Sequence, residues 1–219
     1  MSDRGDDREA SVAVDASADS PWAGRSRASD QSYEQRRMVV LQTAARLFWK
    51  KGYHETSFNE LAELLNITKP TVYYYINSKQ DCLADIAELG QNQIITALKR
   101  ARRMKGTGLD RLIFLFKHYI DVLTSDVGKC LVMVSRRSLQ GKLRDEIENR
   151  IVMAEEEFLA LFDLAIADGS ISVGNKRVVY EAVVGSLNWV AQWYNPEGKI
   201  SKKELISAQV EALTKMLKP

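Results

Sequence analysis

The chain has 219 residues, of which 45% are hydrophobic, and its formal net charge is +2 at pH 7. This length and composition allow one or two domains with a sizeable core and exclude a fibrous protein. The nearly balanced charge excludes a molecule that binds nucleic acid through its whole surface, so any attraction to an anionic partner must come from local patches.

Residues 1–32 are rich in Ser, Asp, Ala and Gly and lack the apolar stretch of a signal peptide or a membrane anchor. We therefore expect a disordered N-terminal arm, no membrane association and a cytoplasmic protein. Arg25 and Arg27 could reach an adjacent minor groove if the rest of the chain binds DNA.

A first helix is predicted from Tyr33, with Gly52 after Lys51 as its C-terminal stop. Its apolar residues recur at steps of three and four: Val40, Leu41, Ala44, Ala45, Leu47 and Phe48. Basic residues also lie along this helix. They could neutralise phosphates, and a solvated helix face is an equally favoured alternative.

Two short helices joined by a tight turn are predicted next, with the motif proper at residues 57–76. The first has one buried face, formed by Phe58, Leu61, Ala62 and Leu65. Asn66 tolerates a left-handed backbone, and Thr68 is a good N-cap for the second helix. Pro70 falls in the first turn of that helix, where it costs little. The spacing is typical of a helix-turn-helix, although such helix pairs also occur in proteins without a DNA role.

The second short helix carries three consecutive tyrosines, Tyr73, Tyr74 and Tyr75. Because Val72 and Ile76 fill its core positions, at least two of these tyrosines should be exposed and suited to phosphate and sugar contacts. A helix of about two turns fits the major groove of DNA. DNA binding is therefore the favoured interpretation of this segment.

The run from Arg36 to Leu83 resembles the N-terminal domain of TetR-type transcriptional regulators. The matching residues are Arg37, Leu41, Ala44, Ala45, Leu47, Phe48, Gly52, Tyr53, Thr56, Ser57, Leu61, Ala62, Thr71, Tyr73, Tyr75, Ser78, Lys79 and Leu83. The chain departs from the family at Asn66, where the family usually has Gly, and at Pro70 and Ile76. These departures should be tolerated, because Asn accepts the Gly backbone and Pro is accepted near a helix start.

The resemblance implies an all-α fold. A DNA-binding domain at 33–83 runs into a connecting helix at 80–105, and a helical effector-binding and dimerisation domain follows at 106–219. Implied base-edge contacts are Lys69, Thr71 and Tyr74. Implied phosphate contacts are Thr56, Ser57, Tyr73, Tyr75 and Lys79. The alternative for Lys79 is a solvated charge.

Helical patterns continue to the end of the chain, at 109–125, about 131–139, about 142–167, 176–194 and 202–217. The last two helices each have two apolar faces, which suits a bundle in which one face covers the core and the other meets a partner. By the resemblance, this pair forms a homodimer interface. The candidates are Val179, Val183, Leu187, Val190, Ile206, Val210, Leu213 and Leu217.

The resemblance also implies a ligand pocket among the middle helices. Its candidate lining is Phe114, Phe116, Tyr119, Met133, Phe158, Phe162, Trp189 and Trp193, with ordinary core packing as the alternative for each. The string NWVAQWYNPEGKIS resembles the corresponding turn of regulators that respond to acyl-CoA thioesters. Pro196 and Gly198 within it would also serve simply to end a helix.

Cys82 and Cys130 are the only cysteines, and they lack the spacing of a disulfide framework or a metal site. We therefore expect no metal and no cofactor. Buried structural residues are the favoured interpretation of both cysteines, and redox sensing is the alternative.

Three function classes remain. The favoured one is a dimeric repressor that binds a palindromic double-stranded DNA operator and is released by a small hydrophobic effector, with an acyl-CoA thioester as a candidate. The second is a DNA-binding protein whose helical domain binds a protein partner; a core without a pocket would favour it. An enzyme is disfavoured, because phosphate-binding loops and the motifs of metalloproteases and serine hydrolases do not occur in the sequence.

Overall fold

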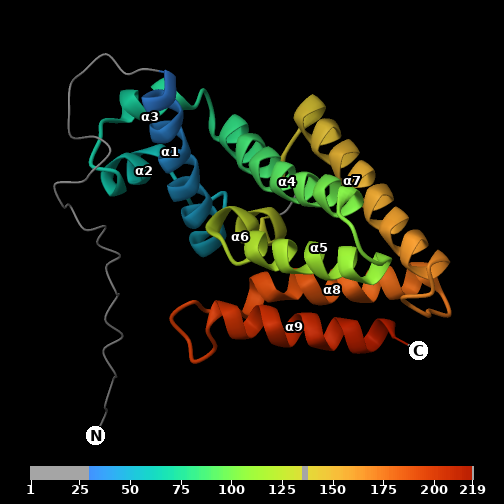
Figure 1. Cartoon of the computed structure of the whole chain (residues 1–219). Coiled ribbons are helices and arrows are strands. Elements are labelled where there is room, and N and C mark those ends of the chain that lie inside the picture. The colour runs from blue at the N-terminus through green and yellow to red at the C-terminus, as the bar shows by residue number, and fades with distance from the viewer. Residues whose placement is uncertain (1–29, 135–137, 219) are drawn as a thin grey trace, which may run out of the picture.

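The computed structural model describes residues 30–134 and 138–218; residues 1–29 of the predicted N-terminal arm, with Arg25 and Arg27, lie outside them, and residues 30–32 already belong to the first helix. Every regular element in the described part is a helix, so the all-α prediction is confirmed (Figure 1). The helices are α1 (Asp30–Lys51), α2 (Phe58–Leu64), α3 (Lys69–Tyr75), α4 (Lys79–Arg103), α5 (Gly108–Leu123), α6 (Asp126–Met133), α7 (Gly141–Ala167), α8 (Lys176–Trp193) and α9 (Lys202–Leu217).

Helices α1 to α3 form a small bundle at one end of the molecule (Figure 1). The Ser57 hydroxyl accepts a hydrogen bond from a backbone N–H in the first turn of α2, and the Thr68 hydroxyl does the same for α3. Asn66, in the turn between them, has a φ of 52°, and Gly52, after α1, has a φ of 101°. The predicted N-cap at Thr68, the left-handed turn residue Asn66 and the glycine stop at Gly52 are all confirmed.

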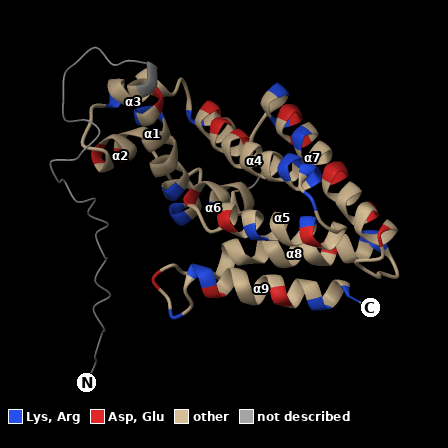
Figure 2. Cartoon of the chain, in the orientation of Figure 1, with Lys and Arg blue, Asp and Glu red and all other residues tan. Residues whose placement is uncertain are grey.

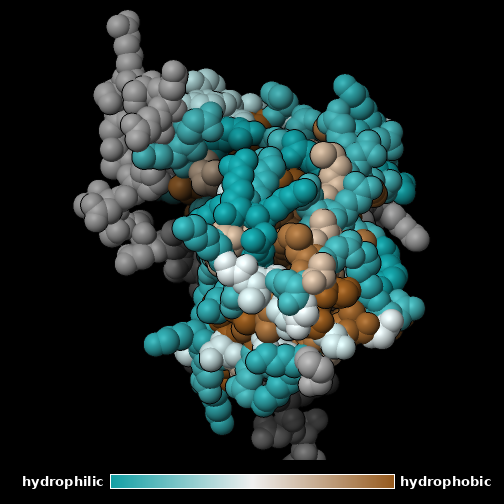
Figure 3. Space-filling model, turned by 45° about the vertical axis from the view of Figure 1, so that its right-hand side comes forward, coloured by the Kyte–Doolittle hydropathy of each residue, from teal (hydrophilic) through white to brown (hydrophobic). Residues whose placement is uncertain are grey.

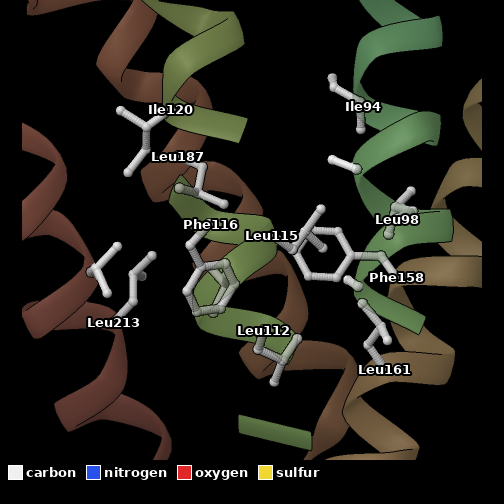
Figure 4. Close-up of a cluster of buried hydrophobic side chains, with 14 of the residues drawn as sticks. Ile94, Leu98, Leu112, Leu115, Phe116, Ile120, Phe158, Leu161, Leu187 and Leu213 are labelled. Atoms are coloured by element: carbon white, nitrogen blue, oxygen red, sulfur yellow. The ribbon is translucent and has the colours of Figure 1, made fainter. Parts of the chain in front are cut away.

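The helical domain is built around α5, which joins layers on both of its sides. Core side chains from α4 and α7 meet α5 on one side and those from α8 and α9 meet it on the other (Figure 4). The largest fully buried ones on α5 are Leu112, Leu115, Phe116, Ile120 and Leu123. Helix α4 connects the two parts of the fold, because it begins beside α3 and ends in this second core (Figure 1).

The predicted helix at about 131–139 is wrong in its position, since α6 spans Asp126–Met133. The Ser125 hydroxyl accepts from the N–H of Gly128 at 3.1 Å and so begins the helix early. Gly128 permits this tight turn, because a Cβ at that position would lie 2.0 Å from the carbonyl oxygen of Val122. The close approach of two backbones carries no periodic signal in the sequence.

The predicted dimer seam is also corrected. Val183, Leu187, Val190, Val210, Leu213 and Leu217 are all buried within this chain, and Val179 and Ile206 pack partly buried against the same core. These side chains cover α5, so they do not form a free surface. The exposed apolar and small residues lie on the other face: Val178, Ala182, Gly185, Trp189 and Trp193 on α8, and Ala212 and Met216 on α9.

Both cysteines are buried in the core shared by α1, α4 and α6, as the favoured interpretation predicted. Burial raises the pKa of both thiols, so neither is poised as a thiolate near neutral pH. Within the described residues, no helix is long and apolar enough to cross a membrane.

Candidate functional site

The outer face of α3 is an exposed surface with one cation and two tyrosines. Lys69 and Tyr73 are exposed, and Tyr74 is 68% exposed. The ring of Tyr73 packs edge-on against Phe58 of α2, with centroids 5.3 Å apart, and the residue is still 47% exposed. This face offers hydroxyl and ammonium donors on a short helix, as major-groove recognition requires.

Two of the predicted phosphate contacts are corrected because their side chains lie inside the domain. Thr56 is buried, and its hydroxyl donates to the carbonyl oxygen of Gly52 at 2.9 Å. Tyr75 is only 7% exposed and belongs to the core. The Thr56 side chain therefore stabilises the loop between α1 and α2, and the Tyr75 side chain packs α3 onto the core of the domain.

Tyr33 of α1 positions the end of α3, a role that the sequence did not reveal. Its hydroxyl donates to the carbonyl oxygen of Tyr74 at 3.4 Å. Its ring lies 5.5 Å from the ring of Tyr74 and 5.1 Å from that of Tyr75, measured between centroids. The partners are 41 residues apart in sequence. An aromatic residue at the start of a helix was the only available signal, and its partner could not be inferred.

Local contacts hold the remaining predicted DNA-binding side chains in place: Ser57 before α2, Thr71 on α3 and Lys79 at the start of α4. The Ser57 hydroxyl caps α2, and the Thr71 and Thr68 hydroxyls share a hydrogen bond of 2.8 Å. The Lys79 ammonium donates to the carbonyl oxygen of His54 at 3.2 Å and lies 4.7 Å from the ring centroid of Tyr53. Partial burial lowers the pKa of Lys79. The ammonium is thus fixed at the first residue of α4, where helix N–H groups also favour an anion.

A cavity of about 290 Å³ lies in the helical domain, walled by α4, α5, α6, α7 and α8. Its wall is mainly apolar and includes Ile94, Leu98, Leu131, Val132, Ile151 and Phe158. Figure 4 shows Ile94 and Leu98 on α4, with Phe158 of α7 beside Leu98. Burial raises the pKa of Tyr119 and raises that of Tyr180, at the same wall, to about 12, as expected in apolar surroundings.

Two of the eight predicted pocket residues, Tyr119 and Phe158, line this cavity. Phe116 and Phe162 are instead fully buried in the core. The remaining predictions are corrected by position: Phe114 packs on His118, Met133 lines a separate hollow beside Trp49, and Trp189 and Trp193 are exposed on α8. Periodicity identifies apolar side chains but not the place where helices separate enough to leave a void.

Two polar residues of the cavity wall, Gln91 and Asn188, were not predicted. Gln91 of α4 is buried, and its amide nitrogen donates to the carbonyl oxygen of Ile147 at 3.3 Å. The Tyr119 hydroxyl donates to the amide oxygen of Asn188 at 3.1 Å. No sequence signal singled out Gln91 as directed inward, because Asn92 and Gln93 follow it directly and are exposed.

A buried lysine of α6 contacts both α1 and the end of α8, between the DNA-binding bundle and the cavity. Lys129 of α6 is 6% exposed, and its ammonium donates to the carbonyl oxygen of Tyr194, at the end of α8, at 2.9 Å. The same ammonium lies 4.6 Å from the ring centroid of Trp49 in α1. Asp126 of α6 accepts from Trp49 and from Arg46, each at 2.9 Å. Figure 2 shows that both basic and acidic positions occur where α1 meets α6.

Known protein families match both parts of the chain. A family model described as "Bacterial regulatory proteins, tetR family" matches residues 40–86. Another, described as "Tetracyclin repressor-like, C-terminal domain", matches residues 105–217, about half of the chain. The HTH-type transcriptional activator FasR of Mycolicibacterium smegmatis is 21% identical over 193 residues, which cover 87% of each chain.

Solved structures give the same picture. AibR, in complex with isovaleryl coenzyme A and operator DNA, is 25% identical over 82% of this chain and 98% of that chain, with a TM-score of 0.71. The ketosteroid transcriptional regulator KstR2 of Mycobacterium tuberculosis has a TM-score of 0.76 at 16% identity, over 84% of this chain and 95% of that chain. FasR and KstR2 are named as regulators of transcription and not as enzymes.

Proposed function

Because this chain belongs to the TetR family of transcriptional regulators, we propose that it binds a palindromic DNA operator as a homodimer and releases it when a small hydrophobic effector binds. The effector would occupy the cavity of the helical domain. The observation that carries this proposal is that α4 and α6 both wall the cavity and both hold α1 of the DNA-binding bundle.

The DNA contacts we propose centre on α3. Lys69, Thr71 and Tyr74 would meet base edges or the groove wall, and Ser57, Tyr73 and Lys79 would meet phosphates. This set keeps the predicted residues that the structure leaves at or near the surface. One such helix reads few base pairs, so two-fold symmetry would double the contacts and the specificity.

The dimer contact we propose is the exposed face of α8 and α9. After Glu181, α8 has no charged residue up to its end at Trp193 (Figure 2). Figure 3 shows hydrophobic surface in the lower half of the molecule, at the level of α8 and α9, below a mainly hydrophilic upper half. An apolar face of this kind is expected where two subunits meet.

The link from effector to operator would run through α4 and α6. Leu131 and Val132 of α6 line the cavity, while Asp126 and Lys129 of the same helix contact α1. On α4, Asp85 forms an ion pair of 2.5 Å with Arg37 of α1. An effector that moved either helix would therefore move the DNA-binding bundle. The shift in the equilibrium between the DNA-binding and the released arrangement would be set by the difference in the effector's affinity for the two.

The cavity favours a small molecule over a protein partner as the occupant of this domain, because a protein partner requires no internal void. Acyl-CoA thioesters belong in the first screen. The turn after α8 resembles that of regulators responding to such thioesters, and AibR was solved with isovaleryl coenzyme A.

The test is selection of bound sequences from a random duplex library with the purified chain, followed by measurement of affinity against salt concentration. Enrichment of a palindrome with half-sites about one helical turn apart is the expected result. Weak, salt-sensitive binding without enrichment would overturn the proposal of a sequence-specific regulator. A reporter fused to the selected operator then shows the sign of regulation, which matters because FasR is named as an activator.

Tyr74 and Lys79 should have different roles in operator binding. We expect Tyr74→Ala or Thr71→Ala to change the preference among operator variants by about tenfold, because their side chains would face the groove. Lys79→Ala should weaken binding to all duplexes. The slope of log affinity against log salt concentration, here called the salt slope, should fall by the amount that corresponds to about one phosphate contact. Fluorescence anisotropy with a panel of duplexes at several salt concentrations measures both effects.

The matched control for Lys79→Ala is Lys99→Ala. Lys99 also lies on α4 and is exposed, but it is twenty residues further along, about 30 Å from the α3 surface. Lys99→Ala should leave the salt slope unchanged. Equal slopes for Lys79→Ala and the unmodified chain would remove Lys79 from the set of phosphate contacts.

The buried ammonium of Lys129 should stabilise the contact between α1 and α6. Lys129→Met keeps the volume but removes the hydrogen bond to Tyr194 and the contact with the Trp49 ring. Amide hydrogen exchange should accelerate about tenfold in the second half of α1, a loss of about 1.4 kcal/mol. Lys117→Met, at an exposed lysine of α5, is the control. Unchanged exchange in α1 would show that Lys129 does not couple these helices.

A further inference from the structure

The described residues that line the cavity include neither Lys, Arg nor His. The two acidic lining residues, Glu155 and Glu181, are partly exposed and so mark its solvent side, whereas Gln91 and Phe158 are buried. A carboxylate or phosphate held inside would lose its hydration without gaining a cation. The interior therefore disfavours an anionic group.

Arg177 does not supply the missing cation. It is paired with both Glu155 and Glu181, and the guanidinium lies 5.5 Å from the ring centroid of Tyr180. Two carboxylates share this one guanidinium, so the three groups carry a net charge of −1 at the solvent side of the cavity. An anion that approached this opening would be repelled.

The cavity wall nevertheless contains polar groups that an occupant could use for hydrogen bonds, on Gln91 and Asn188. The side-chain oxygen of Gln91 is buried and accepts no hydrogen bond from any described residue, while its nitrogen is used by Ile147. The Tyr119 hydroxyl is used as a donor to the oxygen of Asn188, which leaves the amide nitrogen of Asn188 as a donor. A buried acceptor without a partner is costly, and an occupant with an O–H or N–H would satisfy it.

We propose that the effector of this protein is an uncharged amphiphile, an apolar skeleton with one hydroxyl or amide group, and that Gln91 and Asn188 recognise its polar end. This inference rests on the proposed function and specifies the ligand class. The cavity of about 290 Å³ has room for roughly ten non-hydrogen atoms. The other outcome of the test is an acyl-CoA, whose phosphates would have to lie outside, near Glu155 and Glu181.

The first experiment compares ligands with one eight-carbon chain and different ends: 1-octanol, octanoate, octylammonium and octanoyl-CoA. Titration calorimetry with the full chain measures binding. 1-Octanol should bind at least tenfold more tightly than octanoate and octanoyl-CoA, and more tightly than octylammonium. Tightest binding of any charged member, or no binding of 1-octanol, would overturn the proposal.

The second experiment changes the acceptor. Gln91→Met, close in shape, should weaken 1-octanol binding about tenfold. Gln93→Met is the matched control, because Gln93 lies two residues along α4 and is exposed. An unchanged affinity in folded Gln91→Met would contradict the role of this amide. If that variant does not fold, the ligand series on the unmodified chain still decides the question.

Operator binding without ligand separates this inference from the proposed function. A chain that selects a palindromic operator but prefers octanoyl-CoA is still an effector-controlled regulator, and only the ligand class is wrong. A chain that binds 1-octanol without selecting any operator supports the ligand class but contradicts the proposed regulation.

Discussion

Gly128→Ala should destabilise the protein by about 3 kcal/mol. The added Cβ would lie 2.0 Å from the carbonyl oxygen of Val122 and 2.7 Å from Cα of Leu123. Both are backbone atoms, so no flexible side chain can yield, and α6 must shift away from the end of α5. For a chain of this length the melting temperature should fall by roughly 6–12 °C, measured by circular dichroism at fixed protein concentration.

Gly174→Ala is the matched control, because a Cβ at that position meets nothing within 4 Å and no positive φ restricts it. Its melting temperature should stay within about 2 °C of the unmodified chain. Operator affinity is a second measurement. Asp126 and Lys129 of α6 contact Trp49 of α1, so a displaced α6 in Gly128→Ala should loosen α1 and lower the operator affinity. A melting temperature equal to that of Gly174→Ala would contradict the tight α5–α6 turn.

Trp189→Glu should convert the proposed dimer to monomers and lower operator affinity by about 100-fold or more. Trp189 is 64% exposed on the outer face of α8 and would be covered by the partner subunit. A carboxylate placed there would be buried without a cation. The monomer would then bind one half-site at a time and lose the avidity of two linked contacts. Sedimentation equilibrium gives the oligomeric state, and anisotropy with the selected operator gives the affinity.

Val152→Glu tests whether any exposed apolar residue has this effect. Val152 is 54% exposed, but it lies on α7, away from the proposed interface. We expect this variant to remain dimeric and to bind the operator as the unmodified chain does. A dimer that survives Trp189→Glu would place the contact elsewhere, and monomerisation by both variants would point to a general loss of structure.

The helix-turn-helix could be predicted in detail from the sequence, because its determinants are local. Thr68 caps α3, Asn66 takes the left-handed turn, and Val72 within α3 and Ile76 directly after it are both buried. Each of these features involves residues within four positions of one another. The same pattern predicted that at least two of the three tyrosines are exposed. It did not show that Tyr75 is the buried one, because Tyr75 packs against Tyr33 of another helix.

By itself, the sequence of this protein determined the all-α class, the family and the helix-turn-helix, since helix periodicity and capping act over a few residues. Only the tertiary structure decided which apolar face of α8 and α9 turns inward, because both faces have helical spacing and α5 covers just one. It also decided where the cavity lies and placed Lys129 between Trp49 and Tyr194. These features arise where distant helices meet, and periodicity along one helix does not specify its neighbour.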